Sequence, residues 1–357
     1  MTDVAGKRIV LIGGAGFIGH NLALELKRRG AEVSIVDGLQ VNSLLSLHDD
    51  GASTMLERDL YLTMISERLD LLRAAGIPLF VEDARDYLRL SLVLGKLQPQ
   101  VIVLLAAVSH ASRSNKDPYH TFDHSFRTLE NALDIARNEV EQFIYFSSSM
   151  VYGNFDGDAV TEERTCNPVG IYGALKFGGE KLVIAYDQVF NLPYTIIRPS
   201  ALYGERCISR RVGQVFIENA LRGKDIVIEG DGCEGLDFTY IGDLVDGVCR
   251  CIERPEAKSE IFNLTYGEAR SLNHIAEIVQ SEFPGVRVRH VERDGLMPER
   301  GTLDVSKART LLDYNPQNSV ELGYPKYIAW YRGLLERLEA APHTALPTAV
   351  AGLVRHE

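Results

Sequence analysis

The chain has 357 residues, 45% of them hydrophobic and 24% charged, which is an ordinary composition for a globular protein. That length is enough for one large α/β unit or for two domains around a sizeable core. The formal net charge of −11 argues against a nucleic-acid partner, because no basic surplus exists to neutralise phosphates.

The sequence contains no signal for export, membrane insertion or metal binding. No apolar run reaches the ~18 residues that a membrane span needs, and residues 1–8 lead directly into a strand instead of forming a signal peptide. The five cysteines are Cys166, Cys207, Cys233, Cys249 and Cys251. Their only close pair is a C-x-C, which is a poor zinc spacing, and their odd number suits a reducing compartment. We therefore expect a cytoplasmic protein without a membrane partner or a metal site, whose cysteines are packing residues.

The first half of the chain alternates short apolar runs with stretches of helical spacing. Ile9–Ile12 is typical of a buried strand, Ile18–Leu26 of a helix, and Glu32–Asp37 of a second strand. Further strands are predicted at Pro78–Val81, Val101–Leu105, Phe143–Ser147 and Tyr194–Ile197, and helices at Thr121–Asn138 and Tyr172–Val189. This alternation predicts an α/β fold with a Rossmann-type, doubly wound parallel sheet.

Beyond about Tyr203 the pattern changes to a smaller α+β region. Helices are predicted at Val212–Arg222, Asn273–Glu282 and Ser306–Leu312, and strands at Ile226–Glu229 and Val286–Val291. We expect residues 1–202 to form the Rossmann domain, with the chain returning to it within 234–265, near Asp237–Tyr240 and Ile261–Asn263. Residues 203–335 are expected to bind mainly the substrate, and residues 341–357 to form a loosely held tail.

The turn Gly13-Gly14-Ala15-Gly16-Phe17-Ile18-Gly19 follows the first strand, opens the first helix and precedes an acid, Asp37. In this context the glycines predict a dinucleotide-binding site. Gly13 permits the tight turn, Gly16 lets a pyrophosphate approach the backbone, and Gly19 lets helix and strand pack closely. Asp37 is expected to bind the adenosine ribose hydroxyls and to repel a 2′-phosphate, which favours NAD over NADP.

Other residues are expected to line the same cofactor site. The helix N-terminus, with Phe17 and Ile18 in its first turn, stabilises the pyrophosphate charge. Ala106 follows the strand Val101–Leu105 at the same edge of the sheet. Asp83, after the third strand, is either a ligand of the adenine amine or a helix cap, and the sequence does not choose between the two.

Tyr172 and Lys176 form a Y-x-x-x-K pair, whose spacing puts both side chains on one face of a helix. A lysine ammonium beside a tyrosine stabilises the phenolate, so that the phenol can act as an acid and a base near neutral pH. The pair follows the serine-rich strand end Ser147-Ser148-Ser149, at the carboxyl edge of a parallel sheet, where ligands bind. Serine hydroxyls there can bind a substrate hydroxyl or the tyrosine.

Together these motifs resemble the extended short-chain dehydrogenase/reductase family, in particular its NAD-dependent nucleotide-sugar epimerases and dehydratases. The resemblance covers roughly Lys7 to Trp330. Besides the glycine turn and the Tyr172–Lys176 pair, it rests on Leu105-Ala106-Ala107, Ser147-Ser148-Ser149-Met150-Val151-Tyr152-Gly153, Arg198-Pro199-Ser200-Ala201-Leu202-Tyr203-Gly204 and Asp237-Phe238-Thr239-Tyr240-Ile241.

The resemblance implies roles for individual residues. Tyr172 is the catalytic acid and base, Lys176 also holds the nicotinamide ribose, and Ser148 is the assisting hydroxyl. Arg300 matches an arginine that grips the diphosphate of the substrate, a task that suits its forked guanidinium. Ser109, Ser149 and Arg211 are further expected substrate contacts. The alternatives are a capping role for Ser109 and a solvated charge at a helix start for Arg211.

The chain also departs from the family pattern. Dehydratases carry Thr-Asp-Glu where this chain has Ser148-Ser149-Met150, which argues against 4,6-dehydration. Leu236 replaces a common phosphate-binding arginine, Ala201 a common asparagine, and His124 another frequent asparagine. Arg206, Arg210 and Arg211 offer nearby positive charge in compensation. The long connection Gly38–Gly76, with a helical stretch at Leu60–Ala75, is loosely similar to one in uronate 4-epimerases.

The resulting hypothesis is an NAD-dependent epimerase acting at carbon 4 of a nucleoside-diphosphate hexose or uronate, by way of a transient 4-keto sugar. A dehydratase, a decarboxylase or a 4-ketoreductase using the same site is the alternative, and a non-catalytic NAD-binding sensor is a third. The resemblance also implies a homodimer, with Thr121–Asn138 and Tyr172–Val189 in contact. The sequence does not reveal the nucleotide or the sugar.

Overall fold

The computed structural model describes residues 4–40, 55–108, 111–137, 139–293 and 298–340, so the predicted tail at 341–357 lies outside the described residues. A seven-stranded sheet, in the order β11-β6-β5-β4-β1-β2-β3, forms the centre, and all neighbouring strands in it are parallel. Its strands are β1 (Arg8–Ile12), β2 (Glu32–Val36), β3 (Leu79–Phe80), β4 (Val101–Leu104), β5 (Gln142–Phe146), β6 (Tyr194–Arg198) and β11 (Glu260–Asn263). This order confirms the predicted doubly wound Rossmann-type sheet.

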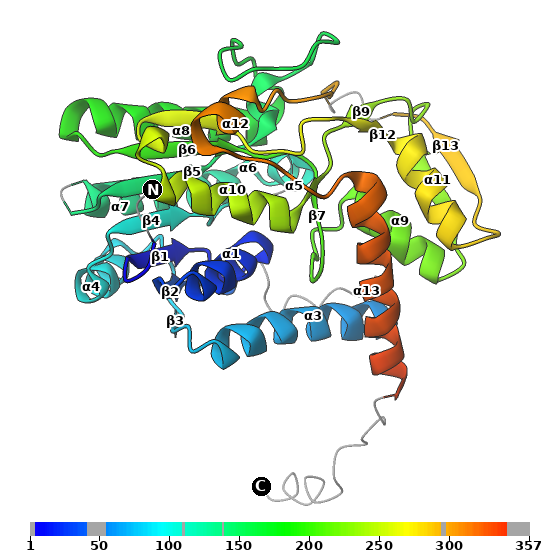
Figure 1. Cartoon of the computed structure of the whole chain (residues 1–357), viewed down its shortest axis with the longest axis horizontal. Helices are drawn as coiled ribbons and strands as arrows, with labels where there is room; N and C mark the ends of the chain where they lie inside the picture. The colour runs from blue at the N-terminus through cyan, green and yellow to red at the C-terminus, as the bar shows by residue number, and fades with distance from the viewer. Residues whose placement is uncertain (1–3, 41–54, 109–110, 138, 294–297, 341–357) are drawn as a thin grey trace, which may run out of the picture.

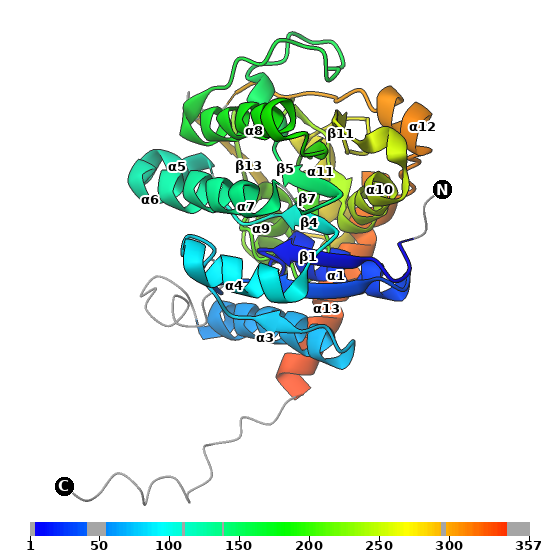
Figure 2. The same cartoon turned by 90° about the vertical axis from the view of Figure 1, so that its left-hand side faces the viewer.

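Helices cover both faces of the sheet because both faces are apolar. Successive side chains of a strand point to opposite faces, so Ile9 and Leu11 lie in one core while Val10 and Ile12 lie in the other. The first core is closed by α1 (Phe17–Arg28), α10 (Ile241–Glu253) and α12 (Ser306–Leu312), the second by α4 (Tyr87–Leu97), α7 (Thr128–Ala136) and α8 (Gly170–Phe190). Figures 1 and 2 show these two helical layers with the strands between them.

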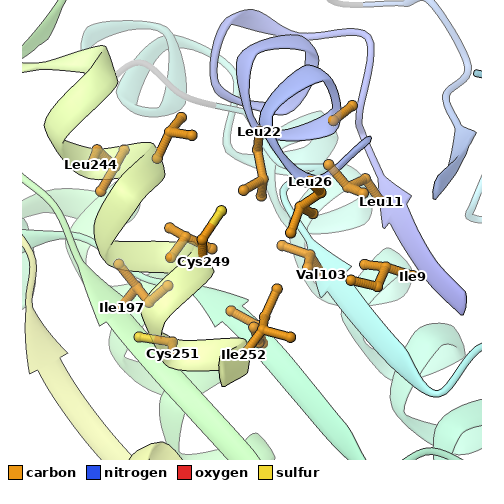
Figure 3. Packing of buried hydrophobic residues seen from close by; sticks show 14 of the residues in the cluster. Ile9, Leu11, Leu22, Leu26, Val103, Ile197, Leu244, Cys249, Cys251 and Ile252 are labelled. Carbon is orange, nitrogen blue, oxygen red and sulfur yellow. The ribbon is translucent and has the colours of Figure 1, made fainter. Parts of the chain in front are cut away.

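Two of the cysteines lie in the centre of the first core. Figure 3 shows Cys249 and Cys251 on α10 packed among apolar side chains of α1 and the sheet strands. Cys207 is also buried, and Cys166 is half-buried. The exception to the predicted packing role is Cys233, which is exposed, because it lies in a surface turn where its own backbone N–H bonds to a carboxylate.

Three two-stranded sheets and three helices form the smaller region. The strand pairs are β7 (Leu202–Tyr203) with β10 (Thr239–Tyr240), β9 (Gly235–Leu236) with β12 (Arg270–Ser271), and β8 (Ile226–Glu229) with β13 (Val288–Val291). The helices are α9 (Val212–Leu221), α11 (Leu272–Glu282) and α13 (Val320–Ala340), which share a separate core. The predicted return to the large sheet is confirmed at Ile261–Asn263 by β11. It is wrong at Asp237–Tyr240, because Thr239 and Tyr240 pair with β7 outside that sheet.

One predicted helix, Thr121–Asn138, is divided in the structure. It consists of α6 (Pro118–Phe122), a π-helical turn (Asp123–Arg127) and α7, and it follows the short helix α5 (Ala111–Lys116). The segment starts before Thr121 because Asp117 caps α6, accepting a 3.2 Å hydrogen bond from the backbone of His120, with a proline at the first helical position.

The long connection after β2 contains one further helix, α3 (Met55–Ala74). Leu60, Tyr61 and Met64 of α3 are buried in the core that α9, α11 and α13 share. Figure 1 shows α3 running beneath α1 and reaching α13. The insertion therefore joins the cofactor side of the molecule to the smaller region. Among the described helices, none is long and apolar enough to cross a membrane.

Candidate active site

The glycine turn leaves no room for a side chain at Gly13, Gly14 or Gly19. Gly13 has φ +83°, and a Cβ built on it would lie 2.5 Å from the backbone nitrogen of Ala106. A Cβ on Gly19 would lie 2.5 Å from the Cα of Gly14, so helix α1 sits directly against the turn. The first-turn N–H groups at Phe17 and Ile18 have no intrahelical acceptor, which suits an anion at this helix end. The shape of the turn fits a dinucleotide.

Asp37 is tied to the same turn. Its carboxylate accepts a 2.9 Å hydrogen bond from the backbone of Ala15 and a 2.8 Å bond from the backbone of Leu39. Burial raises the pKa of this carboxyl, although the two backbone bonds oppose that shift. Two N–H donors leave lone pairs on both oxygens for ribose hydroxyls.

Asp83 is not a helix cap, so that alternative is wrong. The cap of α4 is Asp86, whose side chain accepts from the backbone of Arg89, because Asp86 directly precedes the helix. Asp83 instead pairs with Arg85 at 2.6 Å and accepts a 2.9 Å bond from Gln40. The Arg85 guanidinium holds the pKa of Asp83 well below its usual range. Asp83 is thus a fixed acceptor close to the segment that follows β2.

The Tyr172–Lys176 pair lies in the first half of α8, near the end of β5. The Lys176 ammonium is buried, donates a 2.6 Å hydrogen bond to the carbonyl of Phe146 and lies 5.2 Å from the ring centre of Tyr145. Burial lowers the pKa of Lys176 to about 8, against the opposing effect of Glu180. Tyr172, one turn earlier on the same helix, is half-buried.

Ser148 follows β5 and caps the short helical turn Ser149–Tyr152. Its hydroxyl oxygen accepts a 3.2 Å hydrogen bond from the backbone of Met150, and the residue is 8% exposed. The hydroxyl hydrogen remains for another acceptor, such as a substrate oxygen or a phenolate. The cap therefore holds the Ser148 oxygen in place as an acceptor, and the hydroxyl group can still donate a hydrogen bond.

Arg300 brings a distant segment to this serine-rich turn. Its guanidinium donates to the hydroxyls of Ser149 and Ser200, the latter at 2.9 Å, and to the sulfur of Met150 at 2.9 Å. Its Nε is buried without a hydrogen-bond partner among the described residues. Burial lowers the pKa of Arg300 to about 10, while the charges of Glu234 and Tyr172 oppose that shift. A half-buried cation with an unused donor is suited to an anionic ligand.

For the other residues predicted to bind the substrate, the structure gives fewer contacts. Arg211 stands at the N-cap position of α9, and its charge acts on Arg300 strongly enough to contribute to the lowered pKa of that residue. Arg210 lies over the ring of Tyr61, 5.1 Å from its centre. Leu236 is part of the boundary of the smaller core. Ser109 lies outside the described residues.

A buried polar network behind the site was not predicted from the sequence. Glu180, one turn after Lys176, pairs with Arg198 of β6 at 2.6 Å, and both side chains are almost fully buried. Ser147 donates to Glu180 as well, and Arg198 donates to the hydroxyl of Tyr152 at 2.9 Å. The sequence feature that could have indicated this network is Glu180, an acid on the same helix face as Tyr172 and Lys176. Through this network Ser147, the residue before Ser148, is hydrogen-bonded to α8, the helix that carries the Tyr172–Lys176 pair.

These features define a class of protein. A Rossmann sheet with a glycine turn, an acid after β2, and a tyrosine–lysine pair beside a serine belongs to an enzyme that holds a dinucleotide. A tyrosine beside a lysine is the kind of pair that can move a proton at a hydroxyl group. In the part of the chain that the structure describes, no group of His, Cys, Asp and Glu could hold a metal ion.

Comparison with known proteins makes the class specific. The model of the NAD dependent epimerase/dehydratase family matches residues 9–265. An uncharacterised UDP-glucose epimerase of Bacillus subtilis is 28% identical over 333 residues, covering 92% of this chain and 99% of that protein. A UDP-N-acetyl-α-D-glucosaminuronate decarboxylase of Bacillus cytotoxicus is 27% identical over 341 residues, covering 91% of this chain and 98% of the other.

A solved structure agrees with these relatives. The crystal structure of UDP-glucuronic acid 4-epimerase from Bacillus cereus, in complex with UDP-glucuronic acid and NAD, matches with a TM-score of 0.80 at 26% identity. The match covers 91% of this chain and 99% of that one. The chain therefore belongs to the NAD-dependent epimerase/dehydratase family. The predicted family, fold class and cofactor, NAD, are confirmed.

The close approach at Gly13 gives a first prediction. We expect Gly13→Ala to lower the NAD content of the purified protein at least tenfold, because the new Cβ would collide with the backbone of Ala106. Gly76→Ala is the matched control, since Gly76 has φ +65° with no atom within 4 Å of a built Cβ. The control should lose about 1 kcal/mol of unfolding free energy and keep its NAD. NAD released per chain on denaturation is the measurement, and a fully loaded Gly13→Ala protein would contradict the assignment.

Proposed function

We propose that this protein is a nucleotide-sugar epimerase that inverts carbon 4 of a nucleoside-diphosphate hexose or uronate through a transient 4-keto sugar. The observation that carries this proposal is the meeting of Tyr172, Lys176 and Ser148 with the Arg300 guanidinium at one edge of the sheet. Groups suited to proton transfer then lie near a cation suited to an anion, as a sugar attached to a diphosphate requires.

The proposed proton chemistry uses three side chains. Tyr172 removes the proton of the 4-hydroxyl and later returns a proton to the 4-keto oxygen. The buried ammonium of Lys176 stabilises the phenolate electrostatically and holds the nicotinamide ribose. Ser148 donates its free hydroxyl hydrogen to the sugar oxygen or to the phenolate. NAD, when bound, supplies the reversible oxidation at carbon 4.

The cofactor and the substrate are assigned to different sets of residues. The backbone at Gly13, Gly16, Phe17, Ile18 and Gly19 would hold the pyrophosphate of NAD, with Asp37 on the ribose, Asp83 at the adenine and Ala106 against the turn. Arg300 and Arg211 would hold the substrate diphosphate, and Ser149 and Ser109 the sugar. Residues 1–202 with β11 would form the cofactor domain, and residues 203–335 most of the substrate domain.

Two further features support the choice of reaction and assembly. Met150 stands where a dehydratase would need a carboxylate, and its sulfur accepts a hydrogen bond from Arg300 instead. Water loss from the sugar would therefore lack an acid here.

The exposed apolar side chains Val189 and Phe190, 67% and 37% exposed, lie at the end of α8. Their exposure fits a homodimer in which α7 and α8 contact the same helices of a second chain.

The proposed reaction is tested with a panel of UDP-, GDP-, CDP- and dTDP-sugars and the NAD-loaded protein. At least one substrate should give a product of unchanged mass, inverted at carbon 4, without net consumption of NAD. Tyr172→Phe should lower the turnover at least ~100-fold while retaining bound NAD, because the proton acceptor is lost. Tyr186→Phe, also on α8, is the control and should turn over normally. Loss of water or carbon dioxide, or net oxidation of NADH, would assign the chain to another reaction.

A pH profile tests the role of Lys176. Since burial lowers the pKa of Lys176 to about 8, its ammonium is present below that pH and is lost above it. The rate should therefore fall as the pH rises through about 8. Lys176→Arg keeps a positive charge at all these pH values, so any activity that it retains should lack this alkaline fall. Lys181→Gln, an exposed change on the same helix, should keep the wild-type profile. A wild-type rate that stays level past this pH would contradict the electrostatic role of Lys176.

A further inference from the structure

The loop 204–211, which joins β7 to α9, is held by side chains from three other parts of the chain. We call His20 of α1, Arg68 of α3, Arg206 of the loop and Trp330 of α13 the Arg206 cluster. The loop ends in Arg211, whose charge acts on Arg300. The cluster therefore lies between the cofactor turn and the cations assigned to the substrate.

The backbone of Arg206 is the acceptor at the centre of the cluster. Arg206 has φ +61°, a left-handed conformation that costs energy for a residue with a side chain. Its carbonyl oxygen accepts hydrogen bonds from both Nε, at 3.0 Å, and Nη2 of Arg68. The Arg68 side chain is only 1% exposed, so this forked contact is shielded from water. The contact fixes the loop in a conformation that it would not adopt on its own.

The side chain of Arg206 points back to the cofactor helix. Its Nε donates to Nε2 of His20 at 3.3 Å, while Nδ1 of His20 lies 2.9 Å from the carbonyl oxygen of Gly16. Because an arginine can only donate, Nε2 of His20 must accept and Nδ1 must carry the proton. His20 is fully buried and neutral, with a pKa lowered to about 3 by burial. A continuous path of hydrogen bonds thus runs from the glycine turn through His20 and Arg206 to Arg68.

The rest of the Arg206 guanidinium is enclosed by helices α3 and α13. It lies 5.8 Å from the ring centre of Trp330, and its Nη1 is 3.9 Å from a carboxylate oxygen of Glu67. Further along the loop, Arg210 covers the ring of Tyr61, whose hydroxyl donates to the buried Glu218 at 2.8 Å. The insertion helix α3 thus contacts the loop at Arg206 and Arg210, its two non-glycine residues with positive φ.

Stability alone does not account for this arrangement. Arg68 is desolvated, and its Nη1 has no hydrogen-bond partner among the described residues. The Arg206 carbonyl accepts its hydrogen bonds and the charge of Asp37 offsets part of the cost, yet a buried cation here still costs more than an apolar side chain of the same volume. What the cation does supply is a two-pronged contact of fixed geometry, which an apolar residue lacks.

We propose that the Arg206 cluster positions the loop 204–211 against the cofactor turn, so that Arg211 and Arg300 converge on the diphosphate of a nucleotide substrate. This inference rests on the proposed function. His20, Arg68 and Arg206 are positioning residues, since they act through the loop. Arg211 and Arg300 carry like charges that act on one another, so holding the loop that carries Arg211 offsets part of their repulsion before the nucleotide arrives. The insertion helix α3 thereby contributes to the affinity for substrate through the loop.

The experiment measures the binding of free nucleoside diphosphates to the NAD-loaded protein by calorimetry. The wild type is first titrated with UDP, GDP, CDP and dTDP, and the tightest of them becomes the probe. Arg68→Met and His20→Leu, which break the hydrogen-bond path at opposite ends, should each weaken probe binding about tenfold or more, with unchanged NAD content. His20→Gln, whose amide keeps one donor and one acceptor, should stay within about threefold of wild type. Arg73→Ala, which removes an exposed 2.9 Å ion pair with Asp70 on the same helix α3, should bind the probe normally.

The outcomes separate this inference from the proposed function. A wild-type chain that binds none of the four diphosphates would overturn both. Normal probe affinity in folded, NAD-loaded Arg68→Met protein would overturn the positioning role alone. If Arg68→Met does not fold, the His20→Leu and His20→Gln pair decides, and equal probe affinity in these two variants would contradict the proposal. Loss of NAD with unchanged probe affinity would also contradict it, because the cluster would then serve the cofactor.

Discussion

The buried ammonium of Lys176 is the contact around which the candidate site is organised. Its hydrogen bond to the Phe146 carbonyl ties the first half of α8 to the end of β5, where Ser148 follows two residues later. A desolvated cation is costly, and Glu180 offsets part of that cost from the next turn of the helix. Because Glu180 is itself paired with Arg198 of β6, side-chain contacts tie the helix to the ends of two strands. Ser148 is held by its own cap, which uses the hydroxyl oxygen as an acceptor and leaves the hydroxyl hydrogen available.

The residues proposed to bind the substrate diphosphate are cations in a protein that is acidic as a whole. The chain carries a net charge of −11, yet Arg211 and Arg300 act on one another at the edge of the sheet. A local group of cations in an acidic protein concentrates small anions without attracting nucleic acid. Leu236, which stands where related proteins commonly have a phosphate-binding arginine, contributes no charge. Arg270, which lies opposite it in the β9–β12 pair, is occupied by Glu268 and Glu321. Arg300 and the loop 204–211 are therefore the features that distinguish how this chain would hold a diphosphate.

The helices and strands that could be predicted are those whose sequence pattern agrees with the way they pack in the fold. The β1–turn–α1 unit follows from an apolar run, glycines and helical spacing, and Ser306–Leu312 was predicted with the observed bounds. Helices α10 and α13 were not predicted. In α13 a proline, Pro325, stands inside the helix, and the buried face mixes three tyrosines with Val320, Gly323, Ile328 and Leu334, so the usual helix signals in the sequence are weak.

Contacts between distant segments could not be predicted from a single sequence. Arg300 and Ser149 are 151 positions apart, and Arg206 and His20 are 186 positions apart. The resemblance supplied Arg300 as a ligand of the diphosphate, but not its contacts with Ser149 and Met150. Nothing in the spacing of Arg68, an arginine in a helical insertion, distinguishes a buried side chain from a solvated one. Only the packing of α3 against α13 and the loop determines its position.

The most direct test of the account follows an isotope at carbon 4 of the sugar. The substrate found in the panel is labelled with deuterium at this carbon and incubated with the NAD-loaded enzyme in ordinary water. If the sugar is oxidised at carbon 4 and reduced again by the same bound cofactor, both epimers at equilibrium will carry the label at carbon 4. Loss of the label to solvent or its transfer to another carbon would contradict transient oxidation at carbon 4 as the central step.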